Sequence, residues 1–246
     1  MLVPADLDVA RQHNFLLSAL PEDEWQRMKP HLSLVDAAVK DLVYEAGLPI
    51  EHVVFPVTSV GSMLNDIEGE TAVEVATIGR EGMAGLPVFL GVSESPNRVV
   101  IQVGGALIRM TAVDLRTFLL GDGVLHAQLH RYVQATIVQL SQNVACNRLH
   151  SSEERAARWL LMTADRVGSS EFFLTQEFLA QMLGVRRGTV SLTAGVLQTA
   201  GLISYSRGHI TITDRGRLEE VACDCYGIVH AEFEQLRSRS AEKRRQ

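Results

Sequence analysis

The sequence predicts an α+β fold in which a strand-rich N-terminal region precedes one long helix and a small C-terminal domain of helices and a hairpin. Three observations predict it. Glycines separate short runs of Val, Ile and Thr between about residues 32 and 110, as turns separate antiparallel strands. Neither Gly nor Pro occurs between Gly123 and Gly168, which favours uninterrupted helix. Helical spacing returns near residue 175 and gives way to strand alternation beyond Gly201.

The N-terminal region begins with a helical pattern over residues 14–30, which Pro21 interrupts and Pro30 closes. The strand-rich region follows from about residue 32, and the regular spacing of its turns indicates an antiparallel sandwich or barrel. The glycines at these turns include Gly47, Gly61, Gly79, Gly82, Gly85, Gly91, Gly104 and Gly105.

The long helix carries side chains at alternating steps of four and three residues, which is the spacing of a heptad seam. Leu129, Val133, Thr136 and Leu140 form the seam, which turns polar toward the end of the helix. Such a seam can pack on the chain's own strand-rich domain or on the same helix of a second copy. We favour the second copy because the helix lies between two domains, so these four residues are the predicted interface of a homodimer.

Residues 175–199 have the pattern of a helix-turn-helix. Thr175 can cap a first helix, Gly184 can end it, and a second helix is expected from about Arg187 to Thr199. Each helix has one apolar face, formed by Phe178, Leu179, Met182 and Leu183 in the first and by Val190, Ala194 and Leu197 in the second.

A β-hairpin follows, because apolar residues alternate on both sides of Arg207-Gly208, where a tight turn is expected. A helix pair joined by a glycine turn also occurs as a support in unrelated proteins. The hairpin directly after the pair favours a winged helix-turn-helix, in which the second helix enters a groove of DNA.

The charge distribution also points to DNA. Residues 186–217 hold five Arg and one Asp, whereas residues 1–150 hold ten basic and seventeen acidic side chains. The formal net charge of −6 excludes a generally basic coat for nucleic acid, so DNA binding must be local to the basic segment. The predicted DNA-binding residues are Thr175, Arg186, Arg187, Thr189, Ser191 and Arg207.

The domain boundary is expected near residue 150, because Ser151 and Glu154 have the spacing of a capping box that starts a new helix. Asp214 can cap one last helix, whose apolar stripe packs either on the winged domain or on a partner subunit. The predicted organisation is a β-domain over 14–122, a dimerisation helix over 123–150, a winged helix-turn-helix over 151–215, and a C-terminal helix with a solvated tail over 216–246.

Other classes of site and location find little support. Cys146, Cys223 and Cys225 are too few for a disulfide framework, and we interpret them as buried thiols rather than a metal half-site, so no metal or cofactor is expected. No phosphate loop or nucleophile elbow is present, which argues against an enzyme. The sequence shows neither a secretory signal nor a membrane-length apolar run, so we expect a cytoplasmic protein without membrane contact.

The segments TQEFLAQMLGVRRGTVSLTAGVLQTAGLI, FPVTSVGSM and IGREGMAGLPVFLGV resemble the Crp/Fnr family of bacterial transcription regulators, and the order of parts matches over nearly the full length. The resemblance implies a jelly-roll-like antiparallel β-roll of the cyclic-nucleotide-binding type as sensor domain. It also implies a homodimer on an inverted-repeat operator in double-stranded DNA, contact with RNA polymerase, and an unidentified small-molecule effector.

The chain departs from the family pattern at the ligand positions, which fall at Gly82, Gly85 and Arg98. Members that bind cyclic AMP use a Gly-Glu pair and an Arg followed by a small hydroxyl residue, but here no Glu follows Gly85, and Val99 follows Arg98. Cyclic AMP is therefore not expected to bind in the ordinary way, and the β-roll senses another ligand or serves as a scaffold. The N-terminal cysteine cluster of iron–sulfur members is also missing.

The second helix departs as well. Arg187 keeps the first of three residues that read a well-known palindrome in family members, whereas Gly188 and Leu192 replace the other two. A different operator sequence is expected. The alternative function is a small-molecule receptor whose winged domain contacts a protein instead of DNA.

Overall fold

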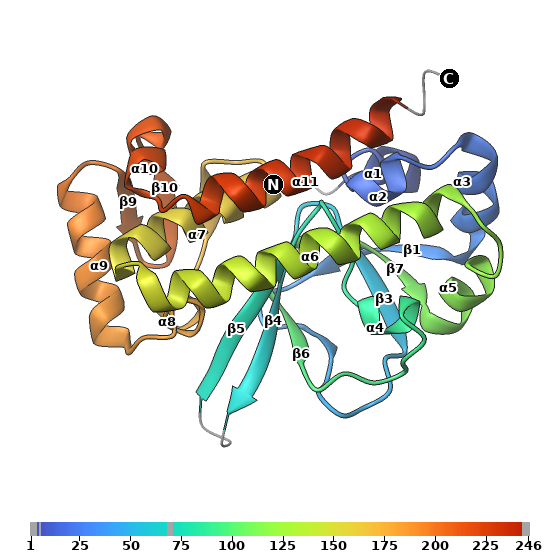
Figure 1. Cartoon of the computed structure of the whole chain (residues 1–246), viewed down its shortest axis with the longest axis horizontal. Coiled ribbons are helices and arrows are strands. Elements are labelled where there is room, and N and C mark those ends of the chain that lie inside the picture. Colours follow the sequence, from blue (N-terminus) through green and yellow to red (C-terminus); the bar gives the residue numbers. More distant parts are fainter. Residues whose placement is uncertain (1–3, 5, 68–70, 243–246) are drawn as a thin grey trace.

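The computed structural model describes residues 4, 6–67 and 71–242 and confirms the predicted α+β architecture (Figure 1). The N-terminal strands form a three-stranded sheet in the order β1-β7-β3 and a four-stranded sheet in the order β2-β6-β4-β5, with antiparallel pairing throughout. This arrangement is the β-roll. Its strands are β1 (Leu32–Ala37), β2 (Leu42–Tyr44), β3 (His52–Pro56), β4 (Val60–Ile67), β5 (Thr71–Ile78), β6 (Arg98–Val103) and β7 (Gly105–Thr111).

Short helices surround the roll. The helical pattern expected over 14–30 forms two helices divided near Pro21, and a further helix precedes them. The buried Asn14 amide donates hydrogen bonds to the carbonyls of Pro56 and Gly82, both at 2.9 Å, and so anchors the N-terminal helices to the roll. The helices are α1 (Leu7–Arg11), α2 (Phe15–Ser18), α3 (Glu22–Met28), a 3-10 turn (Lys29–His31), α4 (Leu86–Phe89) and α5 (Ala112–Phe118).

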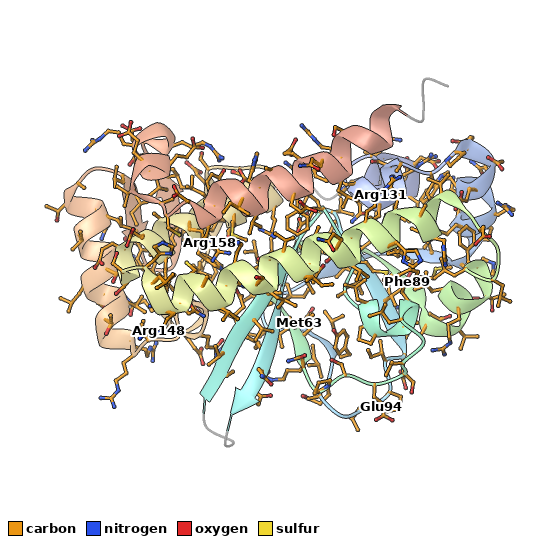
Figure 2. The ribbon with its side chains drawn as sticks, viewed as in Figure 1. Met63, Phe89, Glu94, Arg131, Arg148 and Arg158 are labelled. Carbon is orange, nitrogen blue, oxygen red and sulfur yellow. The ribbon has the colours of Figure 1, made fainter. Side chains whose placement is uncertain are left out.

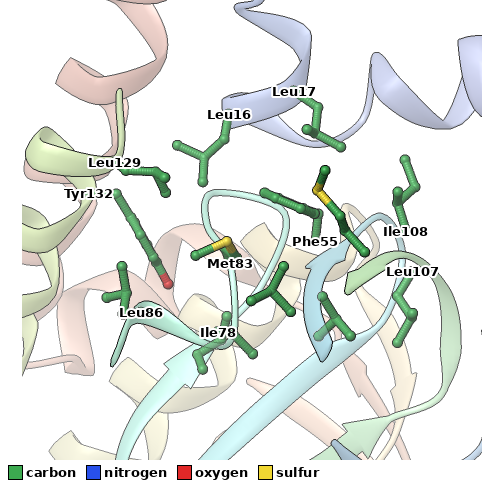
Figure 3. Packing of buried hydrophobic residues seen from close by; sticks show 14 of the residues in the cluster. Leu16, Leu17, Phe55, Ile78, Met83, Leu86, Leu107, Ile108, Leu129 and Tyr132 are labelled. Carbon is green, nitrogen blue, oxygen red and sulfur yellow. The ribbon is translucent and has the colours of Figure 1, made fainter. Parts of the chain in front are cut away.

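Large apolar side chains fill the interior of the roll (Figure 3). Phe55 comes from β3, Leu16 from α2, and Leu129 and Tyr132 from the long helix. Leu129 is 0% exposed within its own chain, so the prediction that it lies at a dimer interface is wrong. The physical reason is the phase of the helix, which turns this side chain toward the roll.

The long helix α6 (Val124–Leu149) runs across the molecule above the strands (Figure 1). It starts after Gly123, where the Glu24 carboxylate accepts hydrogen bonds from the first two backbone N–H groups, both at 3.0 Å. Gln139 and Asn143 face the roll and donate hydrogen bonds to the carbonyls of Thr77 at 3.2 Å and Val75 at 2.7 Å. One side of α6 is therefore committed to its own chain.

The C-terminal domain begins with the predicted capping box: Ser151 and Glu154 bond each other's backbone N–H groups at 2.7 and 3.3 Å. The predicted helix pair and wing follow, and the wing gains a third strand, in the order β8-β10-β9. This extra strand has only three residues, too few to show an alternating pattern. The elements are α7 (Ser152–Val167), β8 (Glu171–Phe173), α8 (Gln176–Leu183), α9 (Arg187–Thr199), β9 (Ile203–Ser206) and β10 (His209–Ile212).

The single helix expected after Asp214 is in fact two, α10 (Arg215–Val221) and α11 (Cys225–Glu242). Asp214 caps α10 by accepting from the Arg217 N–H at 3.1 Å. The chain then turns, and α11 runs back alongside α6 of the same chain (Figure 1), with the Phe233 ring 6.4 Å from that of Tyr132. Residues 243–246 of the predicted tail lie outside the described residues. Over the described part of the chain, none of the helices is apolar and long enough to cross a membrane.

Candidate nucleic-acid interface

Helix α9 presents a polar leading end and buries its opposite face. Val190, Ala194 and Leu197 are buried, as the helical spacing predicts. Arg186 stands at the N-cap, and its side chain makes no capping hydrogen bond with any described residue. The first backbone N–H groups of α9 therefore have no side-chain acceptor from the N-cap, and they carry the positive end of the helix dipole.

The predicted DNA-binding residues on α9 differ in exposure. Arg186, Arg187 and Ser191 are exposed, and Thr189 is half-buried. Thr193, which follows Val190 by three residues on the same face of α9, is buried, and its hydroxyl lies 3.5 Å from a carboxylate oxygen of Glu153 on α7. Packing against α7 thus removes Thr193 from the surface.

An open groove of about 390 Å³ lies between α9 and the wing and gathers four of the predicted residues. Arg186 is not among its lining residues and lines a second groove, between α8 and β5, to which Arg187 also contributes. Arg187 therefore stands where the two grooves meet. The residues that line the first groove include Thr175, Arg187, Ser191 and Arg207, together with Gln176, Gln198 and Tyr205.

The wing is held in place at its tip. Arg207 and Gly208 both have positive φ, at 50° and 83°, and Ser206 pairs with His209, as in a two-residue hairpin turn. The Phe173 ring lies so close to Gly208 that a side chain there would meet it at 2.5 Å. Gly208 is thus required by both conformation and space, and the turn leaves the Arg207 side chain exposed.

Several residues of this surface were missed in the sequence. The Gln198 side chain accepts a hydrogen bond from the Tyr205 N–H at 2.8 Å, and the Tyr205 hydroxyl donates to the Leu174 carbonyl at 3.2 Å, which ties the wing to the helix pair. Leu192 is 72% exposed on α9, and Val196 is also exposed. The sequence does contain a signal for these two residues. Val190, Ala194 and Leu197 already form the buried face of the second helix, so large apolar side chains at other positions of that helix are expected to be exposed.

Two buried polar contacts join the C-terminal domain to the roll. The Arg166 guanidinium on α7 pairs with the Glu81 carboxylate at 2.8 Å, with both side chains buried. The Trp159 indole donates a hydrogen bond to Glu74 on β5 at 3.1 Å. On the surface, Lys40 pairs with Glu177 of α8 at 2.9 Å. The orientation of α7 and α8 is thus set partly by residues of the β-roll.

The predicted ligand residues of the roll do not form a phosphate site. A side chain at Gly82 would collide with the Tyr132 ring, so that ring occupies the space beside the glycine. Gly85 has a φ of 105° and packs against Val53. The Arg98 guanidinium is paired with the Asp66 carboxylate at 2.8 Å, and this pairing raises the pKa of Arg98. The negative charge of Asp66, which is already paired with Arg98, would repel a phosphate at this arginine.

A strip of α6 is only partly covered by the rest of the chain. Val133 and Leu140 are half-buried there, while Ile137 is 54% and Val144 74% exposed. These four residues, called the outer seam below, recur at steps of four, three and four. The outer seam keeps Val133 and Leu140 of the predicted interface and omits the buried Leu129. Thr136 is half-buried next to Ile137, and it stays a predicted interface residue. Near the start of α6, Phe89 lies beside the helix (Figure 2).

Four potential metal ligands meet where α6 ends. Cys146 and His150 come from the last turn of α6 and its C-cap, and Cys223 and Cys225 come from the junction of α10 and α11. Their ligand atoms all lie within 4.8 Å of one another. The sequence interpretation of the cysteines as buried thiols is correct for burial, but the separation of the two segments along the chain hid the cluster and its histidine.

Comparison with known proteins gives a domain match and a fold match. Residues 154–221 match the family model of the Crp-like helix-turn-helix domain. The chain is similar in structure to FixK2 from Bradyrhizobium japonicum, at 15% identity and a TM-score of 0.67, covering 78% of this chain and 98% of that one. It is also similar to a CRP-family transcriptional regulator from Thermus thermophilus, at 15% identity and a TM-score of 0.65, covering 76% and 96%. A search of curated proteins found no match.

Proposed function

We propose that this chain is a DNA-binding transcription regulator of the Crp/Fnr type, and that it acts as a homodimer that reads an inverted-repeat operator with α9 and the wing. The match of residues 154–221 to the Crp-like helix-turn-helix domain and the similarity in fold to FixK2 support the proposal. The observation that carries the proposal is the groove between these two elements, which collects Thr175, Arg187, Ser191 and Arg207. Guanidinium and hydroxyl groups at one open surface suit the base edges and phosphates of duplex DNA.

The residues of this surface divide into two roles. Arg187 is exposed at the leading end of α9, so we assign it to base edges in the major groove, with Thr189 and Ser191 beside it. Arg186 and Thr175 stand at the N-caps of α9 and α8, where the helix dipoles favour phosphate, and we assign them to the DNA backbone. Arg207 is assigned to the backbone next to the site, because it forms the tip of the wing.

Leu192 adds an expectation about the operator. Its exposed side chain on α9 cannot donate or accept a hydrogen bond, so at a base edge it can make only apolar contact. The methyl group of thymine is the apolar feature of the major groove. We therefore expect thymine at the base that faces Leu192.

The dimer is proposed to form through the outer seam. Its spacing is that of a coiled-coil seam, and its residues lie on a strip of α6 that is half-buried at Val133 and Leu140 and exposed at Ile137 and Val144. Burying a large apolar side chain against a second copy contributes roughly 1.5–3 kcal/mol. A two-fold dimer formed through α6 would relate its two copies of α9 by the symmetry that an inverted repeat requires.

The β-roll is proposed to sense a ligand other than cyclic AMP, or to act as a scaffold. The Tyr132 ring beside Gly82 and the Asp66 carboxylate on Arg98 both work against a nucleotide at the ordinary position. RNA polymerase is the further partner that regulators of this type imply, and no residue of this chain is assigned to that contact. No catalytic role is proposed.

Selection of binding sites from random duplex DNA, followed by anisotropy titrations across a salt series, tests the proposal. We expect an inverted repeat whose half-site centres are about 10 base pairs apart. Affinity should fall steeply with salt, because each phosphate contact releases counterions. If the winged domain contacts a protein instead of DNA, the selection would enrich no DNA sequence, and that result would overturn the proposal.

A further inference from the structure

The cluster of Cys146, His150, Cys223 and Cys225 has no part in the proposed DNA contacts. The Cys146 and Cys223 sulfurs are 3.5 Å apart, and the Cys225 sulfur is 3.7 Å from Nδ1 of His150. All three thiols are free, and 3.5 Å is well beyond a disulfide bond of about 2.05 Å. The four ligand atoms thus surround a small common space.

The dimensions of this space are those of a tetrahedral zinc ion. With Zn–S near 2.3 Å and Zn–N near 2.0–2.1 Å, neighbouring ligand atoms of a tetrahedron are about 3.5–3.8 Å apart. The separation of the Cys146 and Cys223 sulfurs and that of the Cys225 sulfur from the His150 Nδ1 both fall in this range. An iron–sulfur cluster places its ligands around several metal atoms and needs more room than ligand atoms within 4.8 Å leave.

The ligand set also suits zinc chemically. Three thiolates and one imidazole form a Cys₃His site, a common structural zinc set, and soft sulfur donors disfavour magnesium and calcium. The cysteines are buried and His150 is only half-buried, so the site has a protein shell and one side open to entry. The last turn of α6 supplies Cys146 and His150 at i and i+4, on one face of the helix.

A buried cation stands beside the cluster. Arg158 of α7 is 7% exposed, and its Nε has no hydrogen-bond partner among the described residues (Figure 2). The Arg158 guanidinium interacts electrostatically with the Cys146 thiol. Zinc with three thiolates carries a net charge of −1, which the Arg158 guanidinium offsets.

We propose that Cys146, His150, Cys223 and Cys225 bind one zinc ion. The ion joins the end of α6 to the loop between α10 and α11, directly before Ser151, where the DNA-binding domain starts. It therefore fixes the C-terminal helices to the end of the dimerisation helix. Binding to the folded chain alone raises the thermal midpoint of unfolding.

The test measures metal in the full chain purified under reducing conditions. We expect about one zinc per chain by mass spectrometry, and on exchange to Co²⁺ the visible bands of a tetrahedral ion with thiolate charge transfer. Cys225→Ser should abolish stoichiometric binding, and His150→Ala should weaken it by at least about ten-fold. His130→Ala is the matched control, because His130 follows His126 on α6 at the same i, i+4 spacing at which His150 follows Cys146, and it should bind zinc as the parent does.

A second measurement keeps the proposal testable if a variant does not fold. The unsubstituted chain has only three cysteines, so every thiol belongs to the cluster. Zinc should protect all three from a thiol reagent, and a chelator should expose all three. Protection of none or only one by zinc, an octahedral Co²⁺ spectrum, or parental binding by Cys225→Ser would overturn the proposal.

Discussion

The Glu74 carboxylate accepts a hydrogen bond from the Trp159 indole at 3.1 Å, which joins the β-roll to the first helix of the DNA-binding domain. Ser62 donates a second hydrogen bond to the same buried carboxylate. Burial raises the pKa of Glu74 to about 7, against the lowering effects of these hydrogen bonds and of Arg166 and Arg158. A group at a domain boundary thus titrates near neutral pH.

This relationship predicts a pH-dependent stability. The folded pKa of Glu74 lies above its ordinary value of 4.5, so between the two values the folded chain holds a proton that the unfolded chain has lost. The contribution is complete below about pH 4.5 and is lost as the pH rises through about 7, by up to about 3 kcal/mol. Urea unfolding at about pH 5 and about pH 8 measures it. Glu74→Gln should remove this part of the dependence, and an equal pH difference in parent and variant would contradict the assignment.

The roles assigned to Arg187 and Arg186 predict different binding defects. Arg187→Ala should cost roughly 1–3 kcal/mol on the selected operator and little on random DNA, because it removes a base contact. Arg186→Ala should weaken both and reduce the slope of log affinity against log salt by about one unit. Anisotropy titrations on both duplexes measure these effects. Equal weakening of all sequences by Arg187→Ala would show that this residue binds phosphate instead.

The outer seam predicts which substitutions separate the subunits. Ile137→Glu with Val144→Glu should give folded monomers, because both side chains are exposed in the single chain and only a dimer would bury their charges. Sedimentation velocity measures the mass, and circular dichroism checks the fold. Leu120→Glu is the control, since Leu120 is an exposed apolar residue outside α6, and it should leave the dimer intact.

Leu129→Glu is expected to behave differently from the outer seam variants. Leu129 lies in the core of the roll, so a charge there should destabilise the folded chain itself. A stable monomeric Leu129→Glu protein would mean that α6 turns its other face outward.

The side chains around Gly82 and Arg98 predict that cyclic AMP does not bind at the ordinary position in the β-roll. Calorimetric titration with cyclic AMP should give no binding in the micromolar range, because Tyr132 fills the space beside Gly82 and Asp66 pairs with Arg98. Arg98→Ala serves as the comparison. Micromolar binding that disappears in Arg98→Ala would show that the arginine leaves Asp66 for a phosphate.

The regular elements could be predicted because their signals are local. The capping box at Ser151 and the Arg207-Gly208 turn each depend on a few neighbouring residues, and both stand in the structure as predicted. The exposed face of α6 was predicted less well, because two overlapping sets of residues have heptad spacing: Leu129, Val133, Thr136 and Leu140, and Val133, Ile137, Leu140 and Val144. Only the position of the roll decides between them.

Features that combine distant segments were beyond local patterns. The metal-ligand cluster combines the end of α6 with Cys223 and Cys225. The apolar stripe after Asp214 predicts one helix, but the chain breaks between α10 and α11, and this break brings Cys223 into the cluster. The filling of the space beside Gly82 likewise needs Tyr132, which lies on another element. The sequence shows these residues but carries no sign of their proximity.

The position of α11 beside α6 bears on how the chain is made. Synthesis proceeds from the N-terminus, so the β-roll and α6 emerge from the ribosome well before the helix that covers part of α6. Until α11 is made, the part of α6 that packs on α11 is open to solvent and to other nascent chains. Helix α11 therefore covers part of the apolar surface of α6 only after α6 has been made, and a chain released before α11 would leave that surface exposed.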